Sequence, residues 1–181
     1  MQRLRGREIS LLPQGSDALN PLVTVGGHIT ETVRRHRGLS RRAAKAHALS
    51  LLSAFRLPDA QRVYRAFPFQ LSGGMARRAA LAIAFAASPR LLVADEPTRG
   101  LDIPTRDAIV RTLRQTAEDL GTAILLVTHD LDVAGGCDRI AVLHRGRLVE
   151  TGSPRDVLGR PCHPFTRQIV DARPENREVR P

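Results

Sequence analysis

The 181-residue sequence predicts an α/β fold in which a mostly parallel sheet carries a helical lobe. Two short apolar runs, 91–94 and 123–127, have the length and composition of strands that parallel sheets cover on both faces. A helical pattern lies between them, and such strand–helix–strand alternation is typical of parallel sheets. The stretch from about residue 22 to 88 shows only helical signals, which predicts a lobe set apart from the sheet.

The first elements follow from local signals. Residues 8–12 predict a short strand, which Pro13 ends. From about residue 24 to 67 the pattern is helical, with Ser40 as the N-cap of one helix and Pro58 as its stop. Apolar residues of that helix recur at steps of three and four and form one face for burial. They are Ala44, Ala48, Leu51, Leu52 and Phe55.

The later elements alternate between helix and strand. Ser72 begins a helix that Pro89 closes, and a second helix starts near Pro104 and ends at Gly121. Residues 140–150 predict a hairpin with a glycine in its turn. Ser153-Pro154 then begins a short helix, since a cap followed by proline is a common start. The residues beyond Ala172 are expected to form a flexible tail.

Composition argues against two classes of function. The net charge of +10 is compatible with nucleic-acid binding, but the arginines are scattered, and five Phe, one Tyr and no Trp offer few stacking platforms. We therefore expect no nucleic-acid partner. The longest run without a polar residue, 79–87, is far shorter than the roughly 20 residues that span a bilayer, and no signal sequence is recognisable. Any membrane link is expected to come through a partner protein.

Ser72, Gly73 and Gly74 stand at a predicted helix start. Free amide N–H groups and the helix dipole favour an anion there, and glycines let the backbone approach a phosphate. The alternative is a simple helix cap, which these residues can also form.

Asp95 and Glu96 directly follow an apolar strand. The carboxyl ends of strands are where open α/β sheets gather their binding groups. Asp95 could hold Mg²⁺ there, and Glu96 could orient or deprotonate the water that attacks a γ-phosphate. A cap for the next turn is the alternative. His129, just after the run 123–127, would face the same crevice and suit a γ-phosphate contact, although a lone histidine is more often structural.

The order of these segments resembles the ATPases of ABC transporters. Residues 71–75 are similar to their signature motif, 93–98 to the Walker B strand, 100–102 to the D-loop and 128–130 to the switch histidine, while Gln14 and 19–26 look like the Q-loop. The resemblance covers essentially residues 5–170 and implies a P-loop NTPase-like parallel sheet with an inserted helical lobe. It also implies ATP and Mg²⁺ as cofactors. The implied nucleotide-binding residues are Leu71, Ser72, Gly73, Gly74, Met75 and Asp102, the metal ligands are Asp95 and Gln14, and the catalytic residues are Glu96, His129 and Gln14.

Finer features resemble one subfamily. The segments 17–21, 57–59, 67–71 and 163–166 are similar to ATPases of dipeptide, oligopeptide and nickel importers. This resemblance implies membrane subunits and a second ATP-binding subunit, identical or different, as partners. It also implies a peripheral location on the cytoplasmic face of the inner membrane.

One part of such an ATPase is not found in these residues: the loop G-x-x-x-x-G-K-[ST], whose lysine reaches the β and γ phosphates. The only lysine, Lys45, has no glycine at the required spacing before it. We expect an incomplete ATPase domain at 1–171, with core segments 5–14 and 89–158, that lacks the N-terminal strands and the Walker A loop. A missing central strand would expose a sheet edge and apolar surface.

Three functions fit this sequence. The first is the ATPase of a peptide or nickel importer, represented by a fragment that is inactive alone. The second is a non-catalytic partner that supplies its signature motif to a complete subunit. The third is an ABC-type DNA-repair ATPase, which the lack of a long coiled-coil pattern disfavours.

Overall fold

The computed structural model describes residues 4–13 and 19–172, so Gln14 and the predicted tail beyond Ala172 lie outside the described residues. The chain divides into two units, Met1–Val127 and Thr128–Pro181, which are taken here one at a time. The first unit contains β1 (Ile9–Leu12), α1 (Val25–Arg37), α2 (Arg41–Ala54), α3 (Ala60–Arg65), the 3-10 helix η1 (Pro68–Gln70), α4 (Gly73–Ala84), β2 (Leu91–Asp95), α5 (Ile103–Leu120) and β3 (Ala123–Val127).

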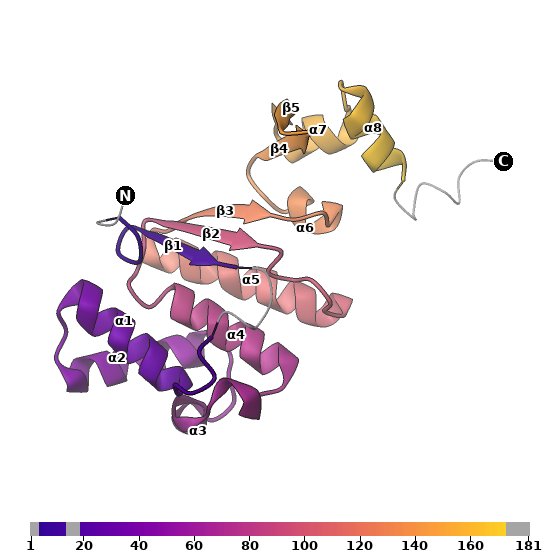
Figure 1. The fold of residues 1–181 in the computed structure, drawn as a ribbon. Helices are drawn as coiled ribbons and strands as arrows, with labels where there is room; N and C mark the ends of the chain where they lie inside the picture. Colours follow the sequence, from indigo (N-terminus) through magenta and orange to yellow (C-terminus); the bar gives the residue numbers. More distant parts are fainter. Residues whose placement is uncertain (1–3, 14–18, 173–181) are drawn as a thin grey trace. The chain divides into compact units, whose positions relative to one another are not determined.

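The first unit is built on a parallel sheet of three strands in the order β1-β2-β3 (Figure 1), which confirms the predicted α/β sheet. Leu11, Val93 and Leu125 stand side by side in the register. Their neighbours Leu12, Ala94 and Leu126 form the next row. Because successive side chains of a strand point to opposite faces, these two rows face opposite sides of the sheet.

Helices α4 and α5 pack against one face of this sheet (Figure 1). On that face Leu12, Leu92 and Ala94 are buried in the same core as residues of both helices. The helical members of this core include Ala79, Leu81, Ile109, Leu113 and Ala117.

The opposite face, which we call the open face, is defined by Leu11, Val93, Leu125 and Val127. Leu11, Leu125 and Val127 are 62%, 54% and 48% exposed. No residue of the open face belongs to the buried core, and no helix of the described first unit covers it. The expected exposed apolar surface is therefore present.

The predicted helical stretch 24–67 is divided into three helices. Gly38, with φ of +66°, ends α1, and Ser40 caps α2 by accepting a hydrogen bond from Ala43 N. Helix α2 stops at Ala54, before the predicted Pro58, because Arg56 takes a left-handed backbone conformation. The lobe joins the sheet layer through buried aromatic packing, in which the rings of Phe55 and Phe85 lie 5.7 Å apart.

The second unit contains the hairpin of β4 (Ile140–His144) and β5 (Arg147–Gly152), with α6 (Leu131–Gly135), α7 (Pro154–Gly159) and α8 (Pro164–Asp171). Gly146 has the left-handed φ that this turn needs, and Ser153 caps α7, as predicted. The Glu150 carboxylate accepts hydrogen bonds from the N–H groups of Cys162 and His163. The bond from Cys162 N contributes most to lowering the pKa of Glu150.

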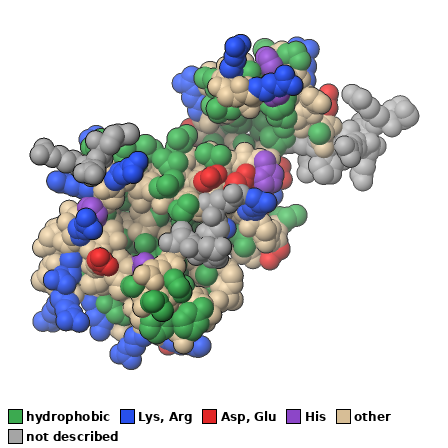
Figure 2. All heavy atoms as spheres, viewed as in Figure 1, with side chains coloured by type: hydrophobic (Ala, Val, Ile, Leu, Met, Phe, Trp, Pro, Cys, Tyr) green, Lys and Arg blue, Asp and Glu red, His purple; other side chains and the backbone are tan. Residues whose placement is uncertain are grey.

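The surface of the first unit carries apolar side chains on the helical lobe as well (Figure 2). Leu22 and Phe69 are strongly exposed, and the ring of Phe69 stacks on Phe67. Among the helices that the structure describes, none has both the length and the apolar character required to cross a bilayer.

Candidate functional site

Asp95 and Glu96 stand where β2 ends. Asp95 is the last residue of the strand, is paired with Val127 of β3, and is half-buried. Glu96 N donates to Val127 O at 2.9 Å, so the ends of β2 and β3 are held together. Glu96 has φ of +47°, which residues with a side chain seldom adopt. Strained backbone of this kind clusters at functional sites.

A compact turn leads from Glu96 to α5. Arg99 N donates to Glu96 O at 3.2 Å, and Leu101 N donates to Thr98 O at 3.3 Å. The turn ends at Asp102, whose carboxylate accepts a hydrogen bond from Thr105 N at 2.8 Å and caps α5. Hydrogen bonds from Thr105 lower the pKa of Asp102. Asp102 is therefore a helix cap in this structure, and its contact with a nucleotide stays a prediction.

The signature segment lies on another element, the start of α4. Ser72 is its N-cap, with the hydroxyl accepting from Met75 N at 3.4 Å. A Cβ added at Gly73 or Gly74 would meet nothing within 4 Å, so this first turn has open space beside its backbone. Leu71 and Met75 are half-buried against the core. Their side chains support the fold, while the glycine backbone is accessible to a ligand.

Arg77, which the sequence analysis did not single out, is buried in α4. It is only 8% exposed, burial lowers its pKa, and its Nη1 atom is buried without a hydrogen-bond partner within the described structure. A signal existed in the sequence, because Arg77 precedes Ala80 and Leu81 by three and four residues and so shares their helix face.

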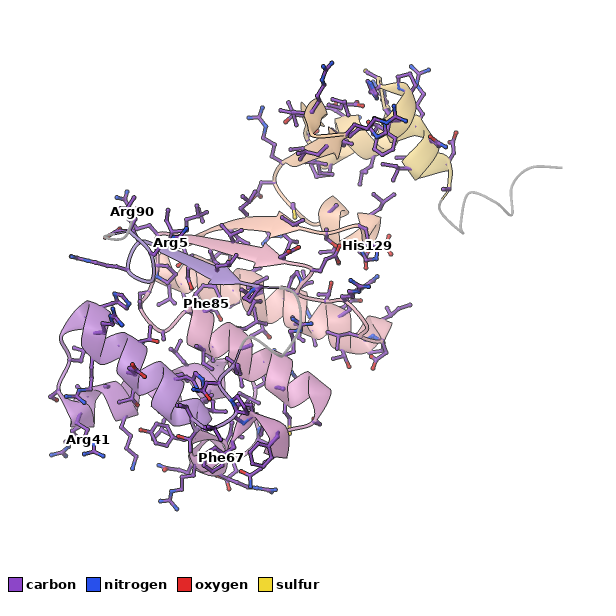
Figure 3. The ribbon with its side chains drawn as sticks, in the orientation of Figure 1. Arg5, Arg41, Phe67, Phe85, Arg90 and His129 are labelled. Atoms are coloured by element: carbon purple, nitrogen blue, oxygen red, sulfur yellow. The ribbon has the colours of Figure 1, made fainter. Side chains whose placement is uncertain are left out.

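His129 belongs to the second unit (Figure 3). It lies in the turn before α6, two residues after the end of β3, and its side chain is exposed. Thr128 Oγ1 accepts a hydrogen bond from Asp130 N at 3.0 Å, and Asp130 caps α6. The turn around His129 is thus fixed from both sides.

A cation at Asp95 would need ligands besides protein side chains. In residues 4–13 and 19–172 no three His, Cys, Asp or Glu side chains come together as a metal site. Mg²⁺ typically takes one or two carboxylates and completes its shell with water and phosphate oxygens. The single half-buried Asp95 beside Glu96 fits that donor set.

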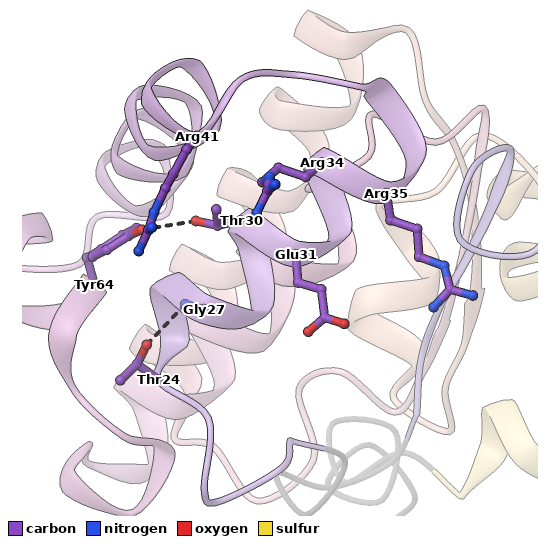
Figure 4. A pocket seen from close by; sticks show the side chains of 8 residues that line it. All are labelled: Thr24, Gly27, Thr30, Glu31, Arg34, Arg35, Arg41 and Tyr64. Atoms are coloured by element: carbon purple, nitrogen blue, oxygen red, sulfur yellow. Dashed lines mark hydrogen bonds between the residues drawn. The ribbon is translucent and has the colours of Figure 1, made fainter.

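A separate groove of about 790 Å³ lies on the helical lobe (Figure 4). One face of α1 forms most of it, and Thr30 Oγ1 lies 3.0 Å from the Tyr64 hydroxyl at its wall. Arg34, Arg35 and Arg41 make it positively charged, with Glu31 as the acidic member. It was not predicted, although the spacing of residues 27, 30, 31, 34 and 35 marks one helix face.

Comparison with known proteins connects these features to one family. The family profile described as ABC transporter matches residues 1–99. A probable peptide ABC transporter ATP-binding protein of Sinorhizobium fredii is 40% identical over 182 residues, which cover 99% of this chain. An oligopeptide transport ATP-binding protein of Bacillus subtilis is 39% identical and covers 96% of it. The chain spans about half of their length, 54% and 49% respectively.

The fold is similar to that of the ATP-binding cassette MJ0796, solved as a dimer in a post-hydrolysis state with ADP and Pi. The TM-score is 0.75 at 31% identity, over 85% of this chain and 66% of that one. One third of the solved cassette thus has no counterpart in the aligned part of this chain.

Proposed function

The chain belongs to the ABC transporter family, and on that basis we propose that it is part of an ATP-hydrolysing subunit that powers the import of peptides. The observation that carries the proposal is the pair Asp95 and Glu96 at the end of β2, held beside the end of β3 by the bond from Glu96 N to Val127 O. Two carboxylates at the carboxyl edge of a parallel sheet suit phosphate and metal chemistry.

Each residue of the pair has its own role. Asp95, at the end of a hydrogen-bonded strand, provides a fixed oxygen ligand for Mg²⁺. Glu96, turned by its left-handed backbone, accepts a hydrogen bond or a proton from the attacking water. When bound, ATP would supply the phosphoryl group, and Mg²⁺ would supply positive charge that offsets the negative charge on the phosphates. Gln14 is assigned to the metal and water, and His129 to the γ-phosphate, as the sequence predicts.

The start of α4 is assigned to phosphate binding. The backbone N–H groups of Gly73 and Gly74 lie in the first turn, where the helix itself supplies no acceptors, and no side chain blocks approach. In this family the signature of one subunit faces the phosphate loop of another, so we assign it to a site shared with a second ATP-binding subunit. Asp102 contributes by fixing the turn that follows Glu96.

The names of the relatives favour peptides as the transported substrate. They include peptide, D,D-dipeptide and oligopeptide transport ATP-binding proteins. We propose membrane subunits as partners and a peripheral location at the cytoplasmic face of the inner membrane. Both units are taken as parts of one ATPase domain within residues 1–171. Transport of nickel stays a prediction.

A second candidate is a non-catalytic subunit that lends its signature to a complete ATPase. The observation that favours it is the accessible start of α4 in a chain whose 181 residues contain no phosphate loop. This candidate predicts that Glu96 is dispensable for transport, whereas the first requires it.

A chimera tests the first candidate. The region of the Sinorhizobium fredii relative that matches this chain is replaced by the chain, and ATP turnover of the purified protein is measured. We expect turnover in the chimera and a loss of at least a hundredfold in Glu96→Gln, since the general-base contribution is about 10²–10⁴.

The matched control is Glu118→Gln, which removes an exposed carboxylate of α5 that pairs with Arg114 Nε at 3.0 Å. It should leave turnover unchanged. A folded chimera without turnover would refute the proposed ATPase, and an active chimera in which both variants are equally active would refute the assignment of Glu96. The unfused 181-residue chain is expected to turn over no ATP.

A further inference from the structure

The groove on the helical lobe is built around a tyrosine that is held in place. The Tyr64 hydroxyl lies 3.0 Å from Thr30 Oγ1, within hydrogen-bonding distance. A Cβ at Gly26 would overlap the Tyr64 ring, so α1 packs directly against that ring. The ammonium group of Lys45 stands 5.8 Å from the ring centroid, within the range of a cation–π contact. The bond between the two hydroxyls uses one of their two hydrogens, and the other can be donated to a ligand.

Two arginines from different helices converge on this pair of hydroxyls. Arg34 lies in the last turn of α1, and Arg41 is the first residue of α2. In Figure 4 both side chains point toward the hydroxyl pair, whereas Arg35 and Glu31 point away from it. Neither of the two converging guanidinium groups makes an ion pair or a hydrogen bond among the residues that the structure describes. Their N–H donors are therefore available to a ligand.

Helix stability accounts for Arg34 but not for Arg41. The helix dipole stabilises a cation in the last turn of a helix, which suits Arg34. The same dipole disfavours a cation in the first turn, where Arg41 stands and where α2 has no acidic residue. An anion bound between the two guanidinium groups would offset this cost.

The charge and the size of the groove define the class of ligand. Three arginines and one glutamate give its lining a net charge of +2, and Lys45 adds a positive charge beside Tyr64. A phosphomonoester carries about −1.5 to −2 charges at pH 7, and its oxygens pair bidentately with the flat N–H fork of arginine. A phosphate alone fills only a small part of about 790 Å³, a volume typical of pockets that hold organic ligands.

We propose that the groove between α1, α2 and α3 binds the phosphomonoester group of an organic ligand. Arg34 and Arg41 hold the phosphate oxygens from two helices, and the pair of Thr30 and Tyr64 donates its remaining O–H group to the phosphate. The rest of the ligand occupies the remaining groove, where Glu31 accepts hydrogen bonds from hydroxyl groups. The groove contains no residue of the proposed ATPase site, so the proposal goes beyond ATP hydrolysis and does not depend on it.

Both a soluble organic phosphate and a lipid headgroup present this chemical group, and two arms of one experiment separate the sources. The first arm titrates the 181-residue chain with sn-glycerol 3-phosphate, uses glycerol as the uncharged control, and follows the arginine Nε–H signals by NMR. The second arm mixes the chain with phosphatidylcholine vesicles that contain phosphatidic acid, a phosphomonoester, or phosphatidylglycerol, a phosphodiester, at equal surface charge.

We expect saturable binding in at least one arm. Saturation by glycerol 3-phosphate identifies a soluble organic phosphate as the ligand. Binding to the vesicles with phosphatidic acid, and not to those with phosphatidylglycerol, identifies a lipid headgroup when glycerol 3-phosphate does not bind. No saturable binding in either arm, or equal binding of the two kinds of vesicle without binding of glycerol 3-phosphate, would overturn the proposal.

Paired variants place the binding in the groove. Arg34→Gln/Arg41→Gln should weaken it at least about tenfold, because both charged hydrogen-bond donors are lost. The matched control Arg42→Gln/Arg62→Gln removes the same charge from exposed positions of α2 and α3 that do not line the groove. It should weaken binding less than about threefold, since salt screens distant exposed charges.

Circular dichroism verifies that each variant is folded. Arg34→Lys replaces the double variant if that one is not, and it should also weaken binding because lysine keeps the charge but lacks the bidentate fork. Equal weakening by the two double variants would overturn the proposal, since the binding would then follow the net charge of the lobe and not the groove.

Discussion

The two faces of the sheet in the first unit are alike in sequence and opposite in packing. Leu92 and Ala94 are fully buried against α4 and α5, while Leu125 and Val127 are about half exposed. Both pairs are aliphatic and belong to strands that lie next to each other. The difference therefore comes from the helices within reach, and not from the strands. An apolar strand predicts that both of its faces are buried, and only the structure shows which face the helices cover.

The sharpest test of this comparison pairs Leu92→Ala with Leu125→Ala. Leu92 is fully buried, so its truncation should lower the free energy of unfolding by about 2–5 kcal/mol. Leu125 is more than half exposed, so its truncation should cost less than about 1 kcal/mol. Urea unfolding followed by circular dichroism measures both. Equal losses would mean that the open face is packed in solution.

A second substitution probes how tightly the helical lobe is packed. A Cβ at Gly26 of α1 would overlap the ring of Tyr64, so Gly26→Ala should lower the free energy of unfolding by about 1–3 kcal/mol. Gly73→Ala is the control, since an added Cβ there meets nothing within 4 Å. The same urea measurement applies. If Gly26→Ala were as harmless as the control, the lobe would be looser than described.

The open face should also be detectable without unfolding. Leu125→Lys/Val127→Lys places two charges on it and should reduce both self-association in sedimentation and the fluorescence of a hydrophobic dye, by about half or more. Unaltered dye binding would place the accessible apolar surface elsewhere, with Leu22 and Phe69 as the next sites to vary.

The smallest expected effect concerns α5, which covers the packed face. The pKa of Asp102 is lowered by its hydrogen bonds from Thr105, so its stabilising contribution is present above the unfolded-state pKa of about 3.9 and is lost as the pH falls through the lower folded value. Asp102→Ala should therefore be less stable than the parent at pH 6, and the gap in the free energy of unfolding should narrow as the pH is lowered below 4. Asp102→Asn keeps an acceptor without a titrating carboxylate, so its advantage over Asp102→Ala should not depend on pH in this range. A gap between the parent and Asp102→Ala that is as wide at pH 2 as at pH 6 would contradict a role for the charge of Asp102.

Local sequence patterns predicted the helices and strands. The order of the strands and the packing of the sheet could not be predicted, because they depend on long-range contacts. The run 123–127 coincides with β3, and Ser40, Ser72 and Ser153 cap helices, because strand and cap signals act within a few residues. The order of the strands and the packing of one face alone depend on segments far apart in sequence.

The features of the candidate site likewise fall into those that the sequence predicts and those that it does not. Asp95 and Glu96 lie at the strand end where the apolar run placed them. The bond from Thr105 N to Asp102 is a local cap, whereas the burial of Arg77 depends on how α4 packs in the fold. The roles of Gln14 and His129 stay predictions.

The left-handed backbone of Glu96 lowers the stability of the fold, whereas the side chain of Glu96 serves the proposed function. An L-residue in that conformation costs about 1–2 kcal/mol, and glycine carries no such penalty. A screen that selected this chain for thermal stability alone would therefore favour glycine at position 96 and discard the carboxylate assigned to the attacking water. Stabilised versions of this protein should be required to keep Glu96.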